Sequence, residues 1–342
     1  MKLPADKVHR LRPFYNGRTV CVTGGAGFIG GHLVDALLSL GASIRVLDDL
    51  SNSTLEHLAE LIELEPERVR FLRGSILDDD ALSEALAGAA TIFHLGAVCS
   101  VQRSVDDPQR SFSVNATGTL RVLQAAKKTN SLSGSGVERI VFASSSSPYG
   151  DEPTLPRVET QMPRPLSPYA ASKLSAEHLL SVHARCYGMS TMSLRLFNVF
   201  GPRQPSDSPY SGVIAAFARR LMAGEAPVIF GDGLQTRDFT FVSDAVLAFL
   251  LAGASKVPPR GEVVNIGTGR SVTLLELARL MAQAAGVPNI HPVLQPERPA
   301  DVKHSLANIN LARELIGYEP MNTLEAGLVE LIEWCKQSVP AH

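Results

Sequence analysis

The sequence predicts an α/β protein with a doubly wound parallel sheet and a smaller, mixed α/β lobe toward the C-terminus. Through the first half, short runs rich in β-branched residues alternate with helical patterns of about 10 to 15 residues, which is typical of βαβ units. The second half is more mixed, and 342 residues suit two lobes of ~150 residues each. We expect a first domain over 17–195, a second lobe over 196–338, and strands near 240–266 that return to the first sheet.

The expected elements follow in chain order. Seven runs predict strands: RTVCVTG (18–24), SIRVLDD (43–49), VRFLRG (69–74), TIFHLGA (91–97), RIVFASS (139–145), MSLRLFN (192–198) and VVNIG (263–267). Helical patterns cover FIGGHLVDALLSLG (28–41), ALSEALAG (81–88) and the ranges 213–224, 243–254, 273–285 and 323–337. Two irregular stretches, a proline-rich one over 153–168 and another over 201–211, predict functional loops.

Composition and charge exclude several classes of protein. Lys plus Arg total 32 and Asp plus Glu total 34, so the net charge of −2 argues against nucleic acid or an anionic membrane as a partner. The four cysteines lie far apart and form no metal-binding pattern. The N-terminus lacks the apolar core of a signal peptide, and the longest uncharged apolar stretch, 245–254, is about half of what a bilayer requires. We therefore expect a cytoplasmic protein without a metal site.

A glycine-rich motif, TGGAGFIG at 23–30, follows the first expected strand and begins the first expected helix. Gly24 permits a tight turn, Gly27 lets the backbone approach a pyrophosphate, and Gly30 lets helix and strand pack closely. The helix N-terminus then offers N–H groups and a positive dipole to the phosphates. This context predicts a Rossmann-type dinucleotide-binding domain over 17–195.

Asp48 ends the second expected strand, 18 residues beyond Gly30. A carboxylate there accepts hydrogen bonds from both adenosine ribose hydroxyls and repels a 2′-phosphate, which favours NAD over NADP. Asp49 is adjacent, but alternation along the strand points its side chain elsewhere. The alternative is an acid that merely ends a strand in solvent.

Tyr169 and Lys173 lie in SPYAASK, where Ser167 and Pro168 are typical of a helix start. Their i, i+4 spacing places phenol and ammonium one turn apart on the same helical face. A free tyrosine has a pKa of about 10, which is too high for a base at neutral pH. We expect the Lys173 cation and the positive nicotinamide ring to lower that pKa by stabilising the phenolate.

Together these motifs resemble the extended short-chain dehydrogenase/reductase family and, within it, the nucleotide-sugar 4-epimerases. The resemblance runs from about Arg18 to Trp334, nearly the whole chain. Beyond the glycines and YxxxK it includes LDDLSNS (47–53), HLGA (94–97), FASSSSPYG (142–150), LFNVFGPRQ (196–204), IFGDGLQTRDF (229–239), NIGTG (265–269) and RPADV (298–302). It implies NAD as cofactor, a UDP-sugar as substrate, and a homodimer.

The resemblance also implies roles for individual residues. Ser145 would hydrogen-bond the reacting sugar oxygen, Tyr169 would act as the base, and Lys173 would bind the nicotinamide ribose. The residues that would line the cofactor site are Gly24, Gly27, Phe28, Ile29, Gly30, Asp48, Asn52, Ser53, Ser75, Ile76, Leu95, Gly96, Ala97, Val98, Asn115, Tyr169, Lys173 and Phe197, the last beside the nicotinamide. Those that would hold the substrate are Ser100, Val101, Ser145, Ser146, Tyr169, Asn198, Val213, Val228, Phe230, Arg237, Val272, Arg298, Asp301 and Ser305.

At some of these positions the residue type itself suits the implied role, and at others it differs from the residue usual in the family. The guanidinium groups of Arg237 and Arg298 suit diphosphate oxygens. Ser75 stands where the family usually has an Asp that contacts adenine, and Cys99 replaces a Lys found in some members. Because of Ser75, the resemblance does not define the adenine contacts of this chain.

The residues after Ser145 distinguish the reactions of the family. Its dehydratases carry an Asp-Glu pair there, where this chain has Ser146 and Ser147, and the Glu typical of decarboxylases is missing too. These residues favour reversible oxidation at C4, which makes the protein an isomerase, an NAD-dependent 4-epimerase. The alternatives are a UDP-glucuronate 4-epimerase, a nucleotide-sugar 4,6-dehydratase and a non-enzymatic NAD-sensing regulator.

Ser305 resembles the family's gate residue beside C2 of the sugar. Epimerases restricted to glucose and galactose commonly have Tyr there, and serine leaves room for an acetamido group. We therefore expect UDP-GlcNAc and UDP-GalNAc to be accepted as well as UDP-glucose and UDP-galactose. The alternative is that Ser305 only caps a turn.

Overall fold

A parallel sheet forms the centre of the computed structural model, which describes residues 3–133, 136–205, 212–297 and 302–338. Its order is β11-β6-β5-β4-β1-β2-β3, and every pair of neighbours is parallel. The strands are β1 (Thr19–Thr23), β2 (Ser43–Asp48), β3 (Val69–Arg73), β4 (Thr91–His94), β5 (Arg139–Ser145), β6 (Thr191–Leu196) and β11 (Arg260–Ile266). All seven expected strands are confirmed, and their order is that of a Rossmann-type fold.

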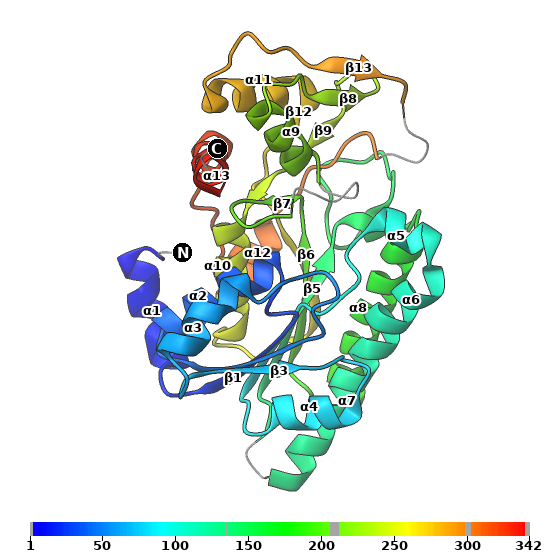
Figure 1. Cartoon of the computed structure of the whole chain (residues 1–342). Helices are drawn as coiled ribbons and strands as arrows, with labels where there is room; N and C mark the ends of the chain where they lie inside the picture. Colours follow the sequence, from blue (N-terminus) through cyan, green and yellow to red (C-terminus); the bar gives the residue numbers. More distant parts are fainter. Residues whose placement is uncertain (1–2, 134–135, 206–211, 298–301, 339–342) are drawn as a thin grey trace.

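Helices cover both faces of this sheet (Figure 1). One face carries α2 (Phe28–Ser39) and α10 (Val242–Gly253), and the other carries α4 (Asp79–Leu86), α7 (Gly118–Ser133) and α8 (Pro168–Tyr187). Alternate strand residues pack into two separate cores, since Val20 and Val22 face the first core and Cys21 faces the second. This alternation buries both faces of the parallel sheet.

The smaller lobe stands at the top of Figure 1, beyond the carboxyl ends of β5 and β6. Its helices α9 (Val213–Met222), α11 (Leu274–Ala285) and α13 (Leu324–Ser338) lie close to the expected ranges. Short strand pairs accompany them: β8 (Val228–Phe230) with β13 (Val293–Gln295), β9 (Thr236–Arg237) with β12 (Val272–Thr273), and β7 (Val199–Phe200) with β10 (Thr240–Phe241). Strands of two or three residues are too short to show an alternating pattern, so the sequence does not predict them.

Several helices are also absent from the sequence prediction. They are α1 (Ala5–Tyr15), α5 (Val101–Asp106), α6 (Pro108–Phe112), a π-helical turn (Ser113–Thr117), α7, a 3₁₀ turn (Ser147–Tyr149) and α12 (Asn310–Ile316). Helix α3 (Glu56–Leu64) lies in the polar stretch between β2 and β3, whose helical pattern does predict it. Helix α1 is held by long-range contacts: Arg12 Nη2 donates to the Ser39 carbonyl oxygen (3.0 Å), and the Tyr15 hydroxyl donates to that of Leu250 (2.7 Å). Local periodicity carries no signal for such contacts.

Within the described ranges, no helix is long and apolar enough to cross a membrane. The four cysteines are free thiols. No group of three or more His, Cys, Asp or Glu side chains with metal-binding geometry occurs among the described residues.

Candidate active site

The glycine-rich turn between β1 and α2 is very tightly packed at Gly24 and Gly30 and less tightly packed at Gly27. Gly24 has a φ of +70°, and a Cβ built on it would lie 2.6 Å from the backbone nitrogen of Gly96. A Cβ on Gly30 would lie 2.2 Å from the Gly24 carbonyl oxygen, whereas the nearest atom at Gly27 is 3.3 Å away. Because α2 starts after Gly27 without a side-chain cap, its first N–H groups can bind phosphate oxygens. The turn therefore fits a dinucleotide pyrophosphate.

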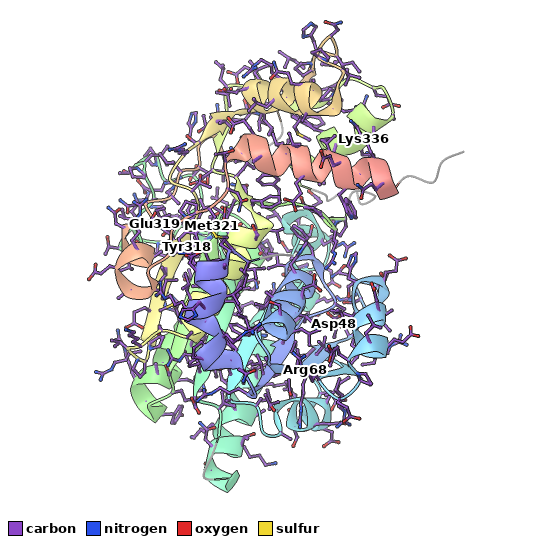
Figure 2. The ribbon with its side chains drawn as sticks, turned by 90° about the vertical axis from the view of Figure 1, so that its left-hand side faces the viewer. Asp48, Arg68, Tyr318, Glu319, Met321 and Lys336 are labelled. Carbon is purple, nitrogen blue, oxygen red and sulfur yellow. The ribbon has the colours of Figure 1, made fainter. Side chains whose placement is uncertain are left out.

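Asp48 ends β2 beside this turn, and Figure 2 shows it in the sheet half of the molecule, away from Lys336 of the lobe. Its carboxylate accepts hydrogen bonds from three groups of the protein: Ala26 N–H (3.0 Å), Leu50 N–H (2.9 Å) and the Ser53 hydroxyl (3.1 Å). A carboxylate has about four acceptor sites, so the expected bonds to two ribose hydroxyls require one internal bond to be shared or released. Burial raises the pKa of this carboxyl group, and the three hydrogen bonds oppose the rise.

A buried hydrogen-bond chain holds the segment after β4 against the glycine turn. The Thr119 hydroxyl donates to the Asn115 carbonyl oxygen (2.6 Å), so Thr119 accepts from His94 Nε2 (3.0 Å). The other ring nitrogen then accepts from the Thr23 hydroxyl (2.7 Å), whose oxygen accepts from Gly96 N–H (3.2 Å). Burial, together with a nearby lysine charge, lowers the pKa of His94 to about 3, so the ring is neutral as this chain of bonds requires.

Asn115 lies in the π-helical turn and links this series of hydrogen bonds to α8, the helix that carries Tyr169 and Lys173. Its Oδ1 accepts from Val98 N–H (2.8 Å), and its Nδ2 donates to the Val98 carbonyl oxygen (3.1 Å) and the Ser172 hydroxyl (3.0 Å). The Ser172 hydroxyl in turn donates to the Tyr169 carbonyl oxygen (2.8 Å). Since both amide hydrogens are used inside the protein, Asn115 shapes the wall of the site through the backbone.

Ser145, Tyr169 and Lys173 come together where β5 ends and α8 begins. The Ser145 hydroxyl hydrogen-bonds the Tyr169 phenol, and its oxygen also accepts from Ser147 N–H (3.1 Å). Lys173 Nζ donates to the Ala143 carbonyl oxygen (2.9 Å) and lies 6.0 Å from the centroid of the Tyr169 ring. The two residues that the YxxxK spacing pairs are thus neighbours without a direct bond.

Burial shifts the pKa values at this cluster. It raises the pKa of Tyr169, and the Ser145 hydrogen bond opposes the rise. Burial also lowers the pKa of Lys173 to about 8. The expected lowering of the Tyr169 pKa by Lys173 together with the positive nicotinamide ring concerns the NAD-bound enzyme and stays a prediction.

Cys99 is a site residue that the sequence analysis treats only as a departure from the family. The electrostatic effect of Cys99 raises the pKa values of both Tyr169 and Lys173, so the sulfur lies near the reacting groups. Its side chain is exposed, and it follows Val98, which Asn115 anchors. Its place two residues after the HLGA motif is the signal that could have indicated this position.

The expected substrate residues come from both halves of the protein. Those of the sheet half are Ser100, Val101, Ser145, Ser146 and Tyr169, and those after β6 or in the lobe are Asn198, Val213, Val228, Phe230, Arg237, Val272 and Ser305. Arg298 and Asp301 lie outside the described residues. Phe197 needs a correction: its side chain is fully buried, 6.2 Å from Tyr149 between ring centroids, so it presents no surface to a nicotinamide ring.

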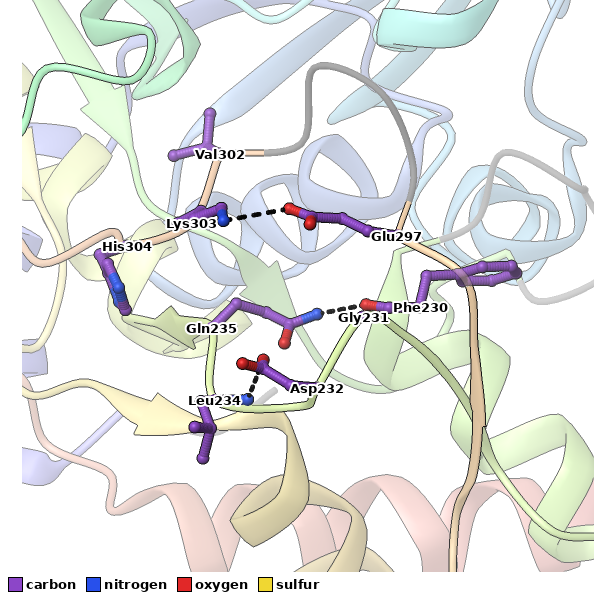
Figure 3. A pocket seen from close by; sticks show the side chains of 9 residues that line it. All are labelled: Phe230, Gly231, Asp232, Leu234, Gln235, Glu297, Val302, Lys303 and His304. Atoms are coloured by element: carbon purple, nitrogen blue, oxygen red, sulfur yellow. Dashed lines mark hydrogen bonds and ion pairs between the residues drawn. The ribbon is translucent and has the colours of Figure 1, made fainter.

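A pocket in the lobe lies between the turn after β8 and the chain that crosses it (Figure 3). It is lined by Phe230, Gly231, Asp232, Leu234, Gln235, Glu297, Val302, Lys303 and His304. Lys303 pairs with Glu297 (3.4 Å) on one side, and Gln235 Nε2 donates to the Phe230 carbonyl oxygen (2.7 Å) on the other. Phe230 is the expected substrate residue in this pocket. His304, which also lines the pocket, immediately precedes Ser305.

The fold and the site define a dinucleotide-dependent α/β enzyme with a Ser-Tyr-Lys cluster at the carboxyl end of its sheet. The model of the NAD dependent epimerase/dehydratase family matches residues 20–267, and the chain belongs to this family. NAD is the cofactor. That the glycine turn, Asp48 and Lys173 bind it stays a prediction from the sequence.

Similar proteins include enzymes that act on different nucleotide sugars. A UDP-glucose 4-epimerase from Mycolicibacterium smegmatis is 39% identical over 92% of this chain and 97% of its own length. The solved UDP-N-acetylglucosamine 4-epimerase from Methanobrevibacter ruminantium is 35% identical, with a TM-score of 0.87 over 95% of this chain and 100% of that chain. The solved UDP-glucose 4-epimerase from Thermotoga maritima is 37% identical, with a TM-score of 0.86 over 94% and 99% of the two chains. A UDP-glucuronate 4-epimerase and a dTDP-glucose 4,6-dehydratase are also similar to it.

Proposed function

We propose that this enzyme is an NAD-dependent 4-epimerase of a nucleotide sugar. The observation that carries the proposal is the hydrogen-bonded Ser145–Tyr169 pair beside Lys173, with hydroxyl side chains at Ser146 and Ser147. A 4,6-dehydratase needs acids that protonate a leaving hydroxyl group and remove the C5 proton. These two serines cannot supply that chemistry, so the cluster supports oxidation and reduction at C4 alone.

Each residue of the cluster has one task in this reaction. Ser145 donates a hydrogen bond to O4 of the sugar, while Tyr169 removes the O4 proton and later returns it. Lys173 keeps a positive charge near the phenolate and binds the nicotinamide ribose. Bound NAD supplies the acceptor and donor of hydride at C4. Between the two transfers the 4-keto sugar turns over in the pocket, so the hydride returns to the opposite face.

The proposal includes UDP as the nucleotide, and the geometry of β8 supports it. Strand β13 pairs with one edge of β8, where Val293 N–H donates to the Pro227 carbonyl oxygen (2.8 Å). In a parallel pair, alternate residues turn their N–H and C=O groups to opposite edges, so those of Val228 point away from β13. A uracil edge presents both donors and acceptors and pairs with such a backbone edge. Arg237 is then the side chain that binds the diphosphate.

The proposal also covers the substituent at C2 of the sugar. Ser305 is 8% exposed, and its N–H donates to the Thr236 carbonyl oxygen (3.1 Å), so its small side chain faces inward from a fixed backbone. This supports acceptance of the N-acetylated sugars UDP-GlcNAc and UDP-GalNAc together with UDP-glucose and UDP-galactose. The division into an NAD-binding domain over 17–195 and a nucleotide-sugar lobe over 196–338 belongs to the same proposal.

A homodimer is the assembly that the surface supports. Large apolar side chains outside the expected substrate residues are exposed on three neighbouring helices, α5, α6 and α8: Val105, Phe112, Val182 and Tyr187. Such a cluster marks an interface in a water-soluble enzyme. Light scattering after size-exclusion chromatography tests this expectation, and a mass of one chain contradicts it.

Product analysis tests the proposed reaction. The purified protein, without added NAD, is incubated separately with UDP-glucose, UDP-GlcNAc and UDP-glucuronate. We expect UDP-galactose and UDP-GalNAc from the first two. A 4-keto-6-deoxy product would show a dehydratase, and turnover of UDP-glucuronate alone would show a glucuronate epimerase. Bound NAD without turnover of any sugar would show a regulator.

A further inference from the structure

The segment 302–309 carries Ser305 without forming a helix or a strand of the sheet. Backbone hydrogen bonds hold it from two sides. Ser305 N–H donates to the Thr236 carbonyl oxygen (3.1 Å), and Asn308 N–H donates to that of Arg157 (2.8 Å). Between these anchors, Ala307 N–H donates to a side chain rather than to the backbone, namely to the carboxylate of Asp238 (3.1 Å).

Asp238 is a buried junction between two irregular segments. Its side chain is 0% exposed and accepts four hydrogen bonds. Oδ1 accepts from Thr268 N–H (2.9 Å) and from the Thr268 hydroxyl (2.7 Å), while Oδ2 accepts from Gly269 N–H (3.0 Å) and Ala307 N–H (3.1 Å). All of the about four acceptor sites of a carboxylate are thus used. The turn after β11 and the segment with Ser305 therefore share one anchor.

Packing around this anchor leaves little freedom. A Cβ built on Gly267 would lie 2.6 Å from the Ala307 Cβ and 2.9 Å from Asp238 Oδ2. Ser305 and Ala307 are two residues apart in an extended segment, so their side chains share a face, and both are buried. A shift of Ala307 therefore moves Ser305 with it.

We propose that Asp238 is a positioning residue for sugar selectivity: it fixes the space beside Ser305 without touching the substrate. This inference rests on the proposed function, because Ser305 is the expected wall beside C2 of the sugar. The acetamido group of an N-acetylated sugar needs the space beside Ser305, and it needs the Ser305 hydroxyl group in the correct position. A plain hexose presents a smaller hydroxyl group there and tolerates a displaced wall.

The test variant is Asp238→Asn. Asparagine has the same size, but its NH₂ group replaces one acceptor oxygen and faces N–H donors, so at least one anchor bond is lost. We expect kcat/KM for UDP-GlcNAc to fall at least about tenfold more than kcat/KM for UDP-glucose. We expect most of this change to lie in KM rather than in kcat, and we expect the NAD content of the protein to be unchanged.

Asp244→Asn is the matched control. Asp244 is also 0% exposed and accepts from Met321 N–H (2.8 Å), Asn322 N–H (3.3 Å) and Asn322 Nδ2 (3.0 Å). The chemical change and the burial are the same, but these donors belong to the segment before α13 rather than to 302–309. We expect a comparable loss of stability without a change in the ratio of the two sugars. Equal ratios in the two variants would overturn the proposal.

A milder variant and a second readout keep the test informative. Thr268→Val removes one donor to Asp238 and keeps the carboxylate, so a smaller shift in the same direction is expected even where Asp238→Asn folds poorly. Hydrogen exchange of the NAD-bound protein measures the amides of 302–309 directly and does not depend on turnover. Faster exchange in Asp238→Asn than in Asp244→Asn is expected even if the wild type converts neither sugar, an outcome that would reject the proposed function alone. Unchanged exchange, or faster exchange without altered selectivity in an active epimerase, rejects the positioning role.

Discussion

The cofactor side and the substrate side of this site are built by different means. On the cofactor side, Gly24, Asp48 and Lys173 sit at strand ends and helix starts, and regular elements position them. On the substrate side, Ser305 sits in an irregular segment that a few hydrogen bonds tie to Thr236, Arg157 and Asp238, far away in the chain. Regular elements are positioned by many repeated backbone hydrogen bonds, whereas this segment depends on a few bonds to distant residues.

This difference predicts different responses to mutation. A change among the reacting groups removes activity toward every sugar, because all substrates meet the same Ser-Tyr-Lys cluster. A change on the substrate side alters the choice among sugars and leaves the reaction intact. The four predictions below test this contrast from the largest expected effect to the smallest.

Tyr169→Phe should lower kcat at least ~10²-fold for every accepted sugar, the lower range for loss of a positioned acid–base group. The phenol is the group that Ser145 hydrogen-bonds at the end of β5. Steady-state kinetics and UDP-sugar binding measure the effect, and affinity should barely change. Tyr187→Phe, at the exposed end of the same helix, is the control. Turnover near the wild-type rate would remove Tyr169 from the mechanism.

Asp48→Asn should weaken NAD retention and relax the discrimination against NADP. The carboxylate ends β2, and a lost hydrogen bond to a charged group corresponds to about 10- to 100-fold in affinity. The nucleotide released from denatured protein is identified by chromatography. Asp49→Asn, next to it and exposed, is the control. Mainly NADP in the wild-type protein would contradict the role of Asp48.

Lowering the pH should destabilise the cofactor side of the site before the substrate side. Burial lowers the pKa of His32 to about 4 and that of His94 to about 3, and both lie in elements around the glycine turn. Their folded-state pKa values are below the unfolded value of about 6.5, so stability is full above pH 6.5 and is lost as pH falls below it. At pH 5 each histidine should cost roughly 2 kcal/mol.

Urea denaturation at pH 7 and pH 5 measures this loss, and hydrogen exchange shows where the protein opens first. His32→Gln should flatten the pH dependence, whereas His178→Gln, at an exposed position of α8, should leave it unchanged. Opening of the lobe before β1 and β4 would contradict the contrast between the two sides.

Ser305→Tyr should remove the N-acetylated sugars while UDP-glucose and UDP-galactose are kept. The ring would fill the space beside C2, and overpacking of about 1–3 kcal/mol predicts at least a fivefold loss of kcat/KM for UDP-GlcNAc. Competition between the two substrates in one assay measures the ratio directly. A wild-type enzyme that converts UDP-glucose but never UDP-GlcNAc would refute the gate, although the epimerase reaction would stand.

The sequence predicts much of the cofactor side and less of the substrate side. The order of strands and the glycine turn follow from local patterns, and the Ser145–Tyr169–Lys173 cluster follows from one loop and one helix start. Only the structure shows that the Lys173 amine bonds to the Ala143 carbonyl oxygen, and the expected effect of Lys173 on Tyr169 stays a prediction for the NAD-bound enzyme. Cys99 beside the cluster is missed because its role depends on the fold of 98–101 and not on a motif.

By itself, the sequence determined the seven strands of the sheet and the glycine turn expected to bind NAD, because alternating burial and glycine spacing act over a few residues. Only the tertiary structure decided where Ser305 stands and what holds it. Its anchors reach back to Thr236 and Arg157, and Asp238 binds Ala307 from 69 positions away. Hydrogen bonds between distant irregular segments leave no periodic pattern in a sequence, because each depends on where the rest of the chain has folded.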